Sequence, residues 1–154
     1  MKRSISATDL LLFVEAWLLL ARIDLTIRLR PYRSWRHWLK EEELGSDSPP
    51  LQRIPPLVTA VERAARHHYA PMNCLRRSVA LQHLLLRRGI GSRLHLGVRR
   101  GSEGLEAHAW LSSNGRILND TPDAGTRYAE LAKEDRERFL EGESGSKQDR
   151  PGTG

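Results

Sequence analysis

The chain has 154 residues, which suits one compact domain better than two. Hydrophobic residues make up 39% of it and charged residues 29%, a balance that excludes both a disordered acidic chain and a membrane bundle. The net charge of +6 favours an anionic partner, and the single cysteine excludes an intramolecular disulfide and a multi-cysteine zinc site.

Near the N-terminus, a strongly apolar run over residues 10–23 follows two basic residues, as in a signal peptide. Glu15 interrupts the run, and no small-x-small cleavage motif follows it. A membrane span needs about 20 apolar residues, and Arg22 arrives too soon. The pattern therefore predicts a helix capped by Thr8 or Asp9. We expect this helix to be buried or to face a partner rather than a membrane, and we expect the protein to be cytoplasmic.

Composition divides the chain into four parts. Residues 1–40 form a helical segment with a break at Pro31. Residues 41–56 combine an acidic run with four prolines and are predicted to be a linker. Residues 57–141 form the predicted core. Residues 142–154 contain no large apolar side chain and are predicted to be a disordered tail.

Within the core, a helical pattern over residues 57–69 stops at Pro71, and Asn73 is well suited to cap a second, central helix. After Gly89 the apolar period changes from 3.6 to 2, which is typical of strands. Three strands are predicted, at residues 94–98, 105–112 and 116–120, followed by a short charged helix over residues 128–140. The expected fold is α+β, with Cys74 at the N-terminus of the central helix and a small antiparallel sheet packed against it.

Cys74 lies in the first turn of this helix. There the unpaired backbone amides and the helix dipole favour a negatively charged, nucleophilic thiolate, and the same amides could donate to an oxyanion. A lone cysteine is otherwise more often a small, inert apolar residue. The functional interpretation therefore depends on a base close by.

His108 and Asp120 are the candidates for that base and its orienting carboxylate. A two-residue turn at Asn114 and Gly115 would place Asp120 on the face of the sheet opposite to His108. A three-residue loop that ends with Gly115 would instead set His108 directly opposite Asp120 on one face. The sequence suits both turns. If the groups meet, Cys74, His108 and Asp120 supply a nucleophile, a base and an orienter.

The run CLRRSVALQHLLLRRGIGSRLHLGVRR (residues 74–100), followed by LEAHAWLSSNGRILND (residues 105–120), resembles the lasso-peptide leader peptidases. These are the protease part of the lasso-peptide B proteins, related to the microcin-processing, transglutaminase-like domain with its papain-type fold. The Trp- and Arg-rich stretch at residues 32–39 is also similar to the start of such proteins. Residue by residue, the resemblance places the catalytic triad of a thiol protease on Cys74, His108 and Asp120.

The resemblance implies a cytoplasmic hydrolase that cleaves the leader from a ribosomally synthesised precursor peptide. A separate ATP-dependent macrolactam synthetase would then close the freed core. In many members a winged-helix leader-recognition domain precedes the protease, whereas residues 1–56 here lack short alternating strands. A separate winged-helix leader-recognition protein is therefore the expected partner. No cofactor or metal is expected, because the adjacent His67 and His68 make a poor chelate.

Two other functions stay open. An acyl or amine transferase on the same fold would use the same thioester chemistry. Alternatively, a non-catalytic basic protein could bind the precursor or nucleic acid through a cationic surface. The arginine pairs that could form such a surface are residues 76–77, 87–88 and 99–100. No nucleic-acid-binding motif accompanies this charge, so a nucleic-acid partner is not expected.

Overall fold

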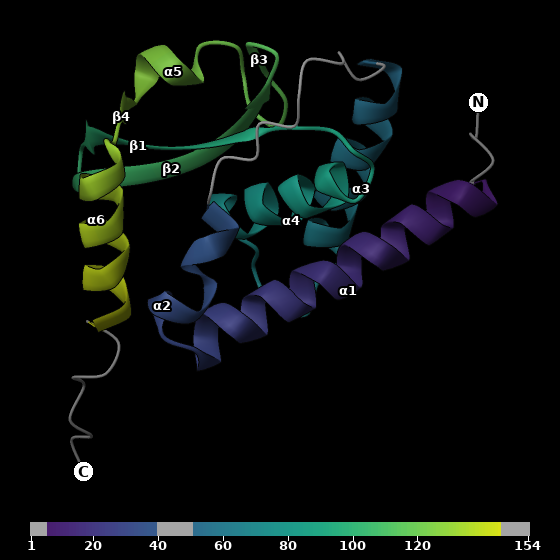
Figure 1. Cartoon of the computed structure of the whole chain (residues 1–154), viewed down its shortest axis with the longest axis horizontal. Coiled ribbons are helices and arrows are strands. Elements are labelled where there is room, and N and C mark those ends of the chain that lie inside the picture. Colours follow the sequence, from purple (N-terminus) through teal and green to yellow (C-terminus); the bar gives the residue numbers. More distant parts are fainter. Residues whose placement is uncertain (1–5, 40–50, 146–154) are drawn as a thin grey trace.

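The computed structural model of the chain describes residues 6–39 and 51–145. Helices lie on one side of a four-stranded antiparallel sheet, and the short helix α5 (Ala124–Arg127) lies on the other side (Figure 1). This arrangement is the predicted α+β fold, in which a central helix begins at Cys74 and a helical segment precedes it.

Helix α1 (Ala7–Leu29) begins with a capping box. The hydroxyl of Ser6 accepts the N–H of Asp9, and the carboxylate of Asp9 accepts the N–H of Ser6. The prediction of Thr8 or Asp9 as the cap was wrong by two or three residues. Asp9 stabilises this terminus from within the first turn, because its carboxylate reaches back to the cap.

One face of α1 packs against α3 (Ile54–Arg66) and α4 (Cys74–Leu86) and contributes to the main core. The rest of α1 exposes six large apolar side chains: Leu10, Leu11, Val14, Leu18, Leu25 and Leu29. Within residues 6–39 and 51–145, no helix is both long and apolar enough to cross a membrane.

After Pro31 the chain forms the short helix α2 (Tyr32–Trp35) and the 3₁₀ helix η1 (Arg36–Leu39). Residues 40–50, most of the predicted linker, lie outside the described residues. The remainder of that linker is helical, because the 3₁₀ helix η2 (Leu51–Arg53) leads into α3. Two of the four prolines that suggested a linker, Pro55 and Pro56, stand in the first turn of α3, where a missing N–H breaks no hydrogen bond.

The central helix α4 is capped as predicted: Oδ1 of Asn73 accepts the N–H of Arg76 at 3.0 Å. The sheet that follows has the strand order β3-β2-β1-β4. Its strands are β1 (Arg93–Gly101), β2 (Gly104–Ser113), β3 (Arg116–Ile117) and β4 (Ala129–Glu130). Strand β3 is much shorter than the predicted strand over residues 116–120.

The two faces of the sheet are different. Its inner face contacts α4 and belongs to the main core through Leu94, Leu96, Ala109 and Leu111. On the outer face a second, smaller cluster is formed by Trp110, Ala124 and Tyr128, with Ile117 packed against it. Strict alternation along β2 therefore assigns His108, two residues before Trp110, to the outer face.

The last helix, α6 (Lys133–Gly145), begins later than the predicted helix over residues 128–140, since α5 and β4 come first. It also continues into the segment 142–154 that was predicted to be disordered, and ends only at Gly145. Residues 146–154 lie outside the described residues.

Candidate active site

His108 and Asp120 form the pair that the sequence suggested. His108 lies opposite Gly97 of β1, and its Nε2 is hydrogen-bonded to Oδ2 of Asp120. The two side chains are 24% and 14% exposed, so the pair is mostly shielded from water and still accessible. The N–H of Thr121 donates to the other carboxylate oxygen at 2.6 Å, and Nη2 of Arg127 lies 3.3 Å from it.

The protonation of this pair follows from its contacts. Burial raises the pKa of the Asp120 carboxyl, but the hydrogen bonds from His108 and the Thr121 amide outweigh it, and the net pKa lies below the usual value. An ionised carboxylate only accepts hydrogen bonds. In the neutral imidazole, Nε2 therefore carries the proton and Nδ1 holds the lone pair of a base. Among the described residues, none forms a hydrogen bond with Nδ1.

The pair forms even though the turn is the shorter of the two considered. Asn114 and Gly115, with φ of 48° and 74°, make a two-residue turn, which in a continued ladder would turn Asp120 away. The ladder does not continue. Strand β3 pairs only with the last two residues of β2, so the segment that follows is free to turn its carboxylate toward His108.

A side chain marks the point where the ladder ends. The N–H of Leu118 still donates to the carbonyl of Leu111 at 2.9 Å. The N–H of Leu111, however, donates to Oδ1 of Asn119 at 2.8 Å, in place of a backbone carbonyl. The side chain of Asn119 thus accepts the hydrogen bond that the edge of β2 offers, while the backbone leaves the sheet. Asp120 is the next residue.

Aromatic rings hold the imidazole in place. The His108 ring stacks on Tyr128 with centroids 4.8 Å apart, and on Trp110 at 6.1 Å. Gly97 makes room for both, because a Cβ there would lie 2.8 Å from Cβ of Tyr128 and 2.9 Å from Cη2 of Trp110. Trp110 is buried and also stacks on the imidazole.

Helix α4 meets β2 along the edge that β3 leaves open. Oγ of Ser78, one turn after Cys74, donates to the carbonyl of Ala109 at 3.2 Å and accepts from Nδ2 of Asn119 at 2.8 Å. Alternate residues of a strand direct their backbone groups to the same edge. The Ala109 carbonyl therefore points to the edge at which Leu111 bonds to Asn119.

The direction of α4 places Cys74 along this edge. The helix runs in the same sense as β2, since Oγ of Ser113 at the end of the strand donates to the carbonyl of Gly91 just after the helix, at 2.7 Å. Cys74 precedes Ser78 by about 6 Å of helix rise, equivalent to about two residues of strand. The start of α4 thus lies beside the part of β2 that contains His108.

The structure does not connect all three groups. Cys74 is partly buried and packs at the margin of the main core, and no described residue forms a hydrogen bond with its thiol. The His108 ring lies on the outer face of the sheet, whereas α4 packs on the inner face. The base–carboxylate pair is therefore formed, and among the described residues no hydrogen bond joins it to the thiol of Cys74.

A buried carboxylate that sequence reasoning missed holds the first turn of α4. Asp24 of α1 is 0% exposed and accepts from Nε of Arg76 at 2.7 Å, Nε of Arg28 at 2.8 Å and the hydroxyl of Tyr69 at 2.7 Å. Burial raises the pKa of Asp24, but the hydrogen bonds from Tyr69 and Arg28 reverse the effect, and its net pKa is low. An acidic residue on an apolar helix was the one signal available in the sequence.

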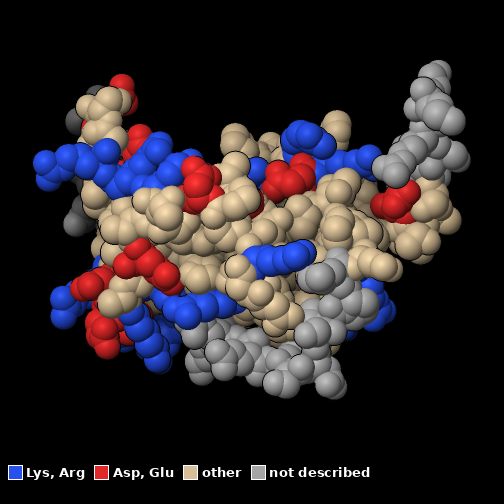
Figure 2. Space-filling model, turned by 90° about the horizontal axis from the view of Figure 1, so that it is seen from above, with Lys and Arg blue, Asp and Glu red and all other residues tan. Residues whose placement is uncertain are grey.

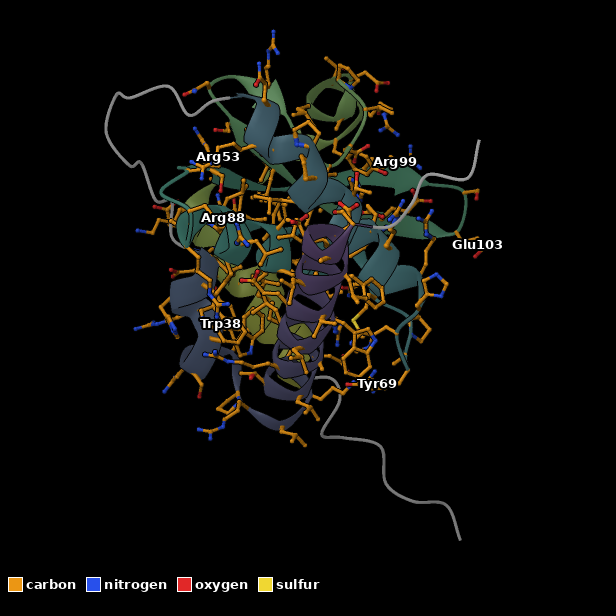
Figure 3. The ribbon with its side chains drawn as sticks, turned by 90° about the vertical axis from the view of Figure 1, so that its right-hand side faces the viewer. Trp38, Arg53, Tyr69, Arg88, Arg99 and Glu103 are labelled. Atoms are coloured by element: carbon orange, nitrogen blue, oxygen red, sulfur yellow. The ribbon has the colours of Figure 1, made fainter. Side chains whose placement is uncertain are left out.

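Most of the arginines expected to form a cationic surface are instead paired with carboxylates. Besides Arg76, these pairs are Arg77–Glu62, Arg87–Glu15, Arg88–Glu15 and Arg99–Glu106. In Figure 3, Arg88 and Tyr69 flank α1 from either side, consistent with their contacts to Glu15 and Asp24. The face seen in Figure 2 intersperses basic and acidic side chains. These arginines therefore do not form a continuous basic surface.

The other histidines pack against aromatic rings. His67 meets the edge of Phe13 with centroids 6.4 Å apart, and His68 stacks on Trp17 at 4.6 Å. In the described part of the chain, no three His, Cys, Asp or Glu side chains gather in a way that could hold a metal ion.

Comparison with known protein families identifies the family of the chain. A family model described as the Transglutaminase-like superfamily matches residues 17–133, a range that includes Cys74, His108 and Asp120. No curated protein and no solved structure matches the chain.

Proposed function

The chain belongs to the transglutaminase-like superfamily, which includes cysteine peptidases and transferases, and from this premise we propose that it is a cysteine peptidase. In this proposal it removes the leader from a lasso-peptide precursor. The observation that supports the proposal is the hydrogen bond between Nε2 of His108 and the Asp120 carboxylate. Cys74 begins helix α4, which contacts the strand that contains His108. The choice of a lasso-peptide precursor as the substrate rests on the resemblance of residues 74–100 and 105–120 to leader peptidases.

Each residue has a defined part in the reaction. The thiol of Cys74, which has no hydrogen bond to His108 in this structure, must first come within hydrogen-bond distance of Nδ1. It then transfers its proton to Nδ1 of His108, and the thiolate attacks the carbonyl carbon of the last leader residue. His108 returns the proton to the leaving nitrogen as the C–N bond breaks, which leaves a thioester on Cys74. Water then attacks the thioester, a proton passes through His108 to the departing sulfur, and the leader leaves with a free carboxylate. Asp120 keeps the ring oriented and stabilises its charged form.

The proposal includes partners. A separate winged-helix protein would present the leader, and an ATP-dependent macrolactam synthetase would consume the freed core in the cytoplasm. The described N-terminal residues 6–39 form helices, with no strand of a winged-helix domain among them. The six exposed apolar side chains of α1 support a protein–protein contact, since apolar groups gathered on a surface commonly mark interaction sites.

An amine or acyl transferase is the second candidate. A thioester on Cys74 can be attacked by an amine as well as by water, and the superfamily contains transferases. A basic scaffold that binds nucleic acid has less support, because most of the arginines proposed for that role are already paired with carboxylates.

Product masses distinguish the two enzymatic candidates. The full chain is incubated with a panel of lasso precursors and a leader-recognition protein, with and without monodansylcadaverine. The peptidase proposal expects two fragments whose masses sum to that of the precursor plus one water, and no cleavage by the Cys74→Ala variant. Incorporation of the amine without release of the leader would contradict the peptidase and support the transferase.

A further inference from the structure

A cavity of about 720 Å³ lies between the segment at residues 32–39 and the start of α6. This volume falls within the range of about 300–1,000 Å³ that is common for ligand sites. Four permanent cations and one carboxylate line it: Arg33, Arg36, Lys133, Arg136 and Glu137. The net positive charge of the lining favours an anionic occupant.

Arg136 is the most deeply buried charge in the lining. The residue is only 8% exposed, and no described carboxylate forms an ion pair with its guanidinium group. A buried charge without a partner is unfavourable and rare in folded proteins. Arg33, Arg36 and Lys133 form no ion pair within the described residues either. The cavity therefore gathers four cations whose charges no described acid neutralises by direct contact.

The number of donors favours several carboxylates over a single phosphate. Phosphate commonly binds the free amides at the N-terminus of a helix. The first turn of α6 already carries Glu134 and Asp135, whose carboxylates would repel a doubly charged phosphate there. The remaining donors are three guanidinium groups and the ammonium group of Lys133, and each guanidinium can hold one carboxylate through two parallel N–H bonds. Several such donors around one cavity suit several carboxylates on one chain.

We propose that this cavity binds an acidic segment of a peptide through at least two carboxylate side chains. Arg136 donates from the buried wall, and Arg33, Arg36 and Lys133 donate from the exposed part of the lining. The site shares no residue with the group formed by His108, Asp120 and Cys74. It therefore stands whether or not the chain cleaves peptides.

Fluorescence anisotropy with labelled hexaglutamate and hexaglutamine tests the proposal on the full chain. Hexaglutamate is expected to bind and hexaglutamine is not. Replacing both Arg33 and Arg36 by glutamine should weaken hexaglutamate binding by about tenfold or more, because two charge-assisted contacts are lost. The matched control is the double variant Arg63→Gln with Arg66→Gln, which removes the same charge from an exposed part of α3 and should bind within about twofold of the parent.

Both double variants alter exposed residues, so the comparison does not depend on the buried Arg136. The glutamates at positions 41–43, outside the described residues, are kept in every variant, so any competition from them stays constant. A second readout locates the peptide. Hexaglutamate should protect Arg33 and Arg36 from phenylglyoxal, while Arg63 and Arg66 react at unchanged rates.

Three results would overturn the proposal. Equal weakening in both double variants would show a response to net charge alone. Equal binding of hexaglutamine would show that carboxylates are not recognised. Stronger displacement of the labelled peptide by inorganic phosphate than by succinate, at matched ionic strength, would assign the cavity to phosphate groups instead.

Discussion

Asp24 and Asp120 are both ionised carboxylates next to elements of the candidate site, but their surroundings differ. Asp24 is 0% exposed and accepts hydrogen bonds from Arg76, Arg28 and Tyr69, which join α1, α4 and the loop between α3 and α4. Asp120 is 14% exposed, and its partner His108 keeps one ring nitrogen free of hydrogen bonds among the described residues. The buried group around Asp24, here called the closed cluster, is suited to stabilise the fold. The partly exposed pair of His108 and Asp120, here called the open pair, is suited to exchange a proton.

The largest expected effect is on catalysis by the open pair. His108→Ala should lower kcat/KM for precursor cleavage by about 10²–10⁴, because the general base is lost. The free energy of unfolding of this variant should fall by about 1–2 kcal/mol, because the mostly shielded ring loses its hydrogen bond to Asp120 and its stacking on Tyr128. Cleavage kinetics and urea titration of the same preparation check both. A variant that cleaves at the parental rate would remove His108 from the mechanism.

The closed cluster should show the opposite response. Asp24→Asn leaves Arg76 without its charged partner and should lower the free energy of unfolding by about 3 kcal/mol. Cleavage per folded molecule should stay within about tenfold of the parent. Asp123→Asn is the matched control, because Asp123 forms an exposed ion pair with Arg127, and exposed ion pairs contribute little to stability. Equal destabilisation by the two variants would contradict the role of Asp24.

Acid titration extends the comparison. The pKa values of Asp24 and Asp120 are both lowered in the folded chain. Their contributions to stability are therefore complete above the unfolded value of about 3.9 and are lost as the pH falls through the lower folded values. The free energy of unfolding should decrease below about pH 4, and less so in Asp24→Asn than in the parent. Parallel pH curves for the two proteins would contradict this linkage.

The packing around His108 is tested by Gly97→Ala. The new Cβ would lie 2.8 Å from Cβ of Tyr128 and 2.9 Å from Cη2 of Trp110, so both residues must shift. We expect a loss of about 1–3 kcal/mol in unfolding free energy, as in other overpacked sites. Cleavage should also fall, because Tyr128 stacks on the imidazole. Unchanged stability and activity would show that this contact does not constrain the site.

The smallest expected effect is at Asn119. Asn119→Ala removes the hydrogen bonds to the Leu111 N–H and Ser78 hydroxyl, which should lower unfolding free energy by about 1–2 kcal/mol. Cleavage should decrease as well, since the same side chain holds α4, β2 and the segment before Asp120 together. Loss of stability with a fully retained rate would limit Asn119 to a structural role.

Local rules were sufficient for much of the fold. The cap at Asn73, the start of α4 at Cys74 and the change of period that predicts β1 and β2 each depend on a few neighbouring residues, and the structure has all of them. The start of α3 was misjudged because prolines in a first helical turn resemble a linker when they follow an acidic run.

The contacts of the candidate site could not be predicted from local sequence patterns. The approach of Asp120 to His108 depends on where β3 ends, and that depends on Asn119 replacing a backbone carbonyl at the strand edge. The cluster around Asp24 joins residues that are about 50 positions apart in the sequence, and only tertiary packing brings them together. The residue types therefore indicated the candidate catalytic residues, whereas the contacts that position these residues depend on the tertiary structure of the whole domain.

The rate of Cys74 alkylation by iodoacetamide, measured from pH 4 to pH 10, tests the central claim most directly. If Cys74, His108 and Asp120 act as one unit, the parent reacts quickly at neutral and mildly acidic pH, and both His108→Ala and Asp120→Asn shift the profile to higher pH. A slow reaction that rises only near the ordinary thiol pKa of about 8.5, and that is the same in all three proteins, would contradict the claim.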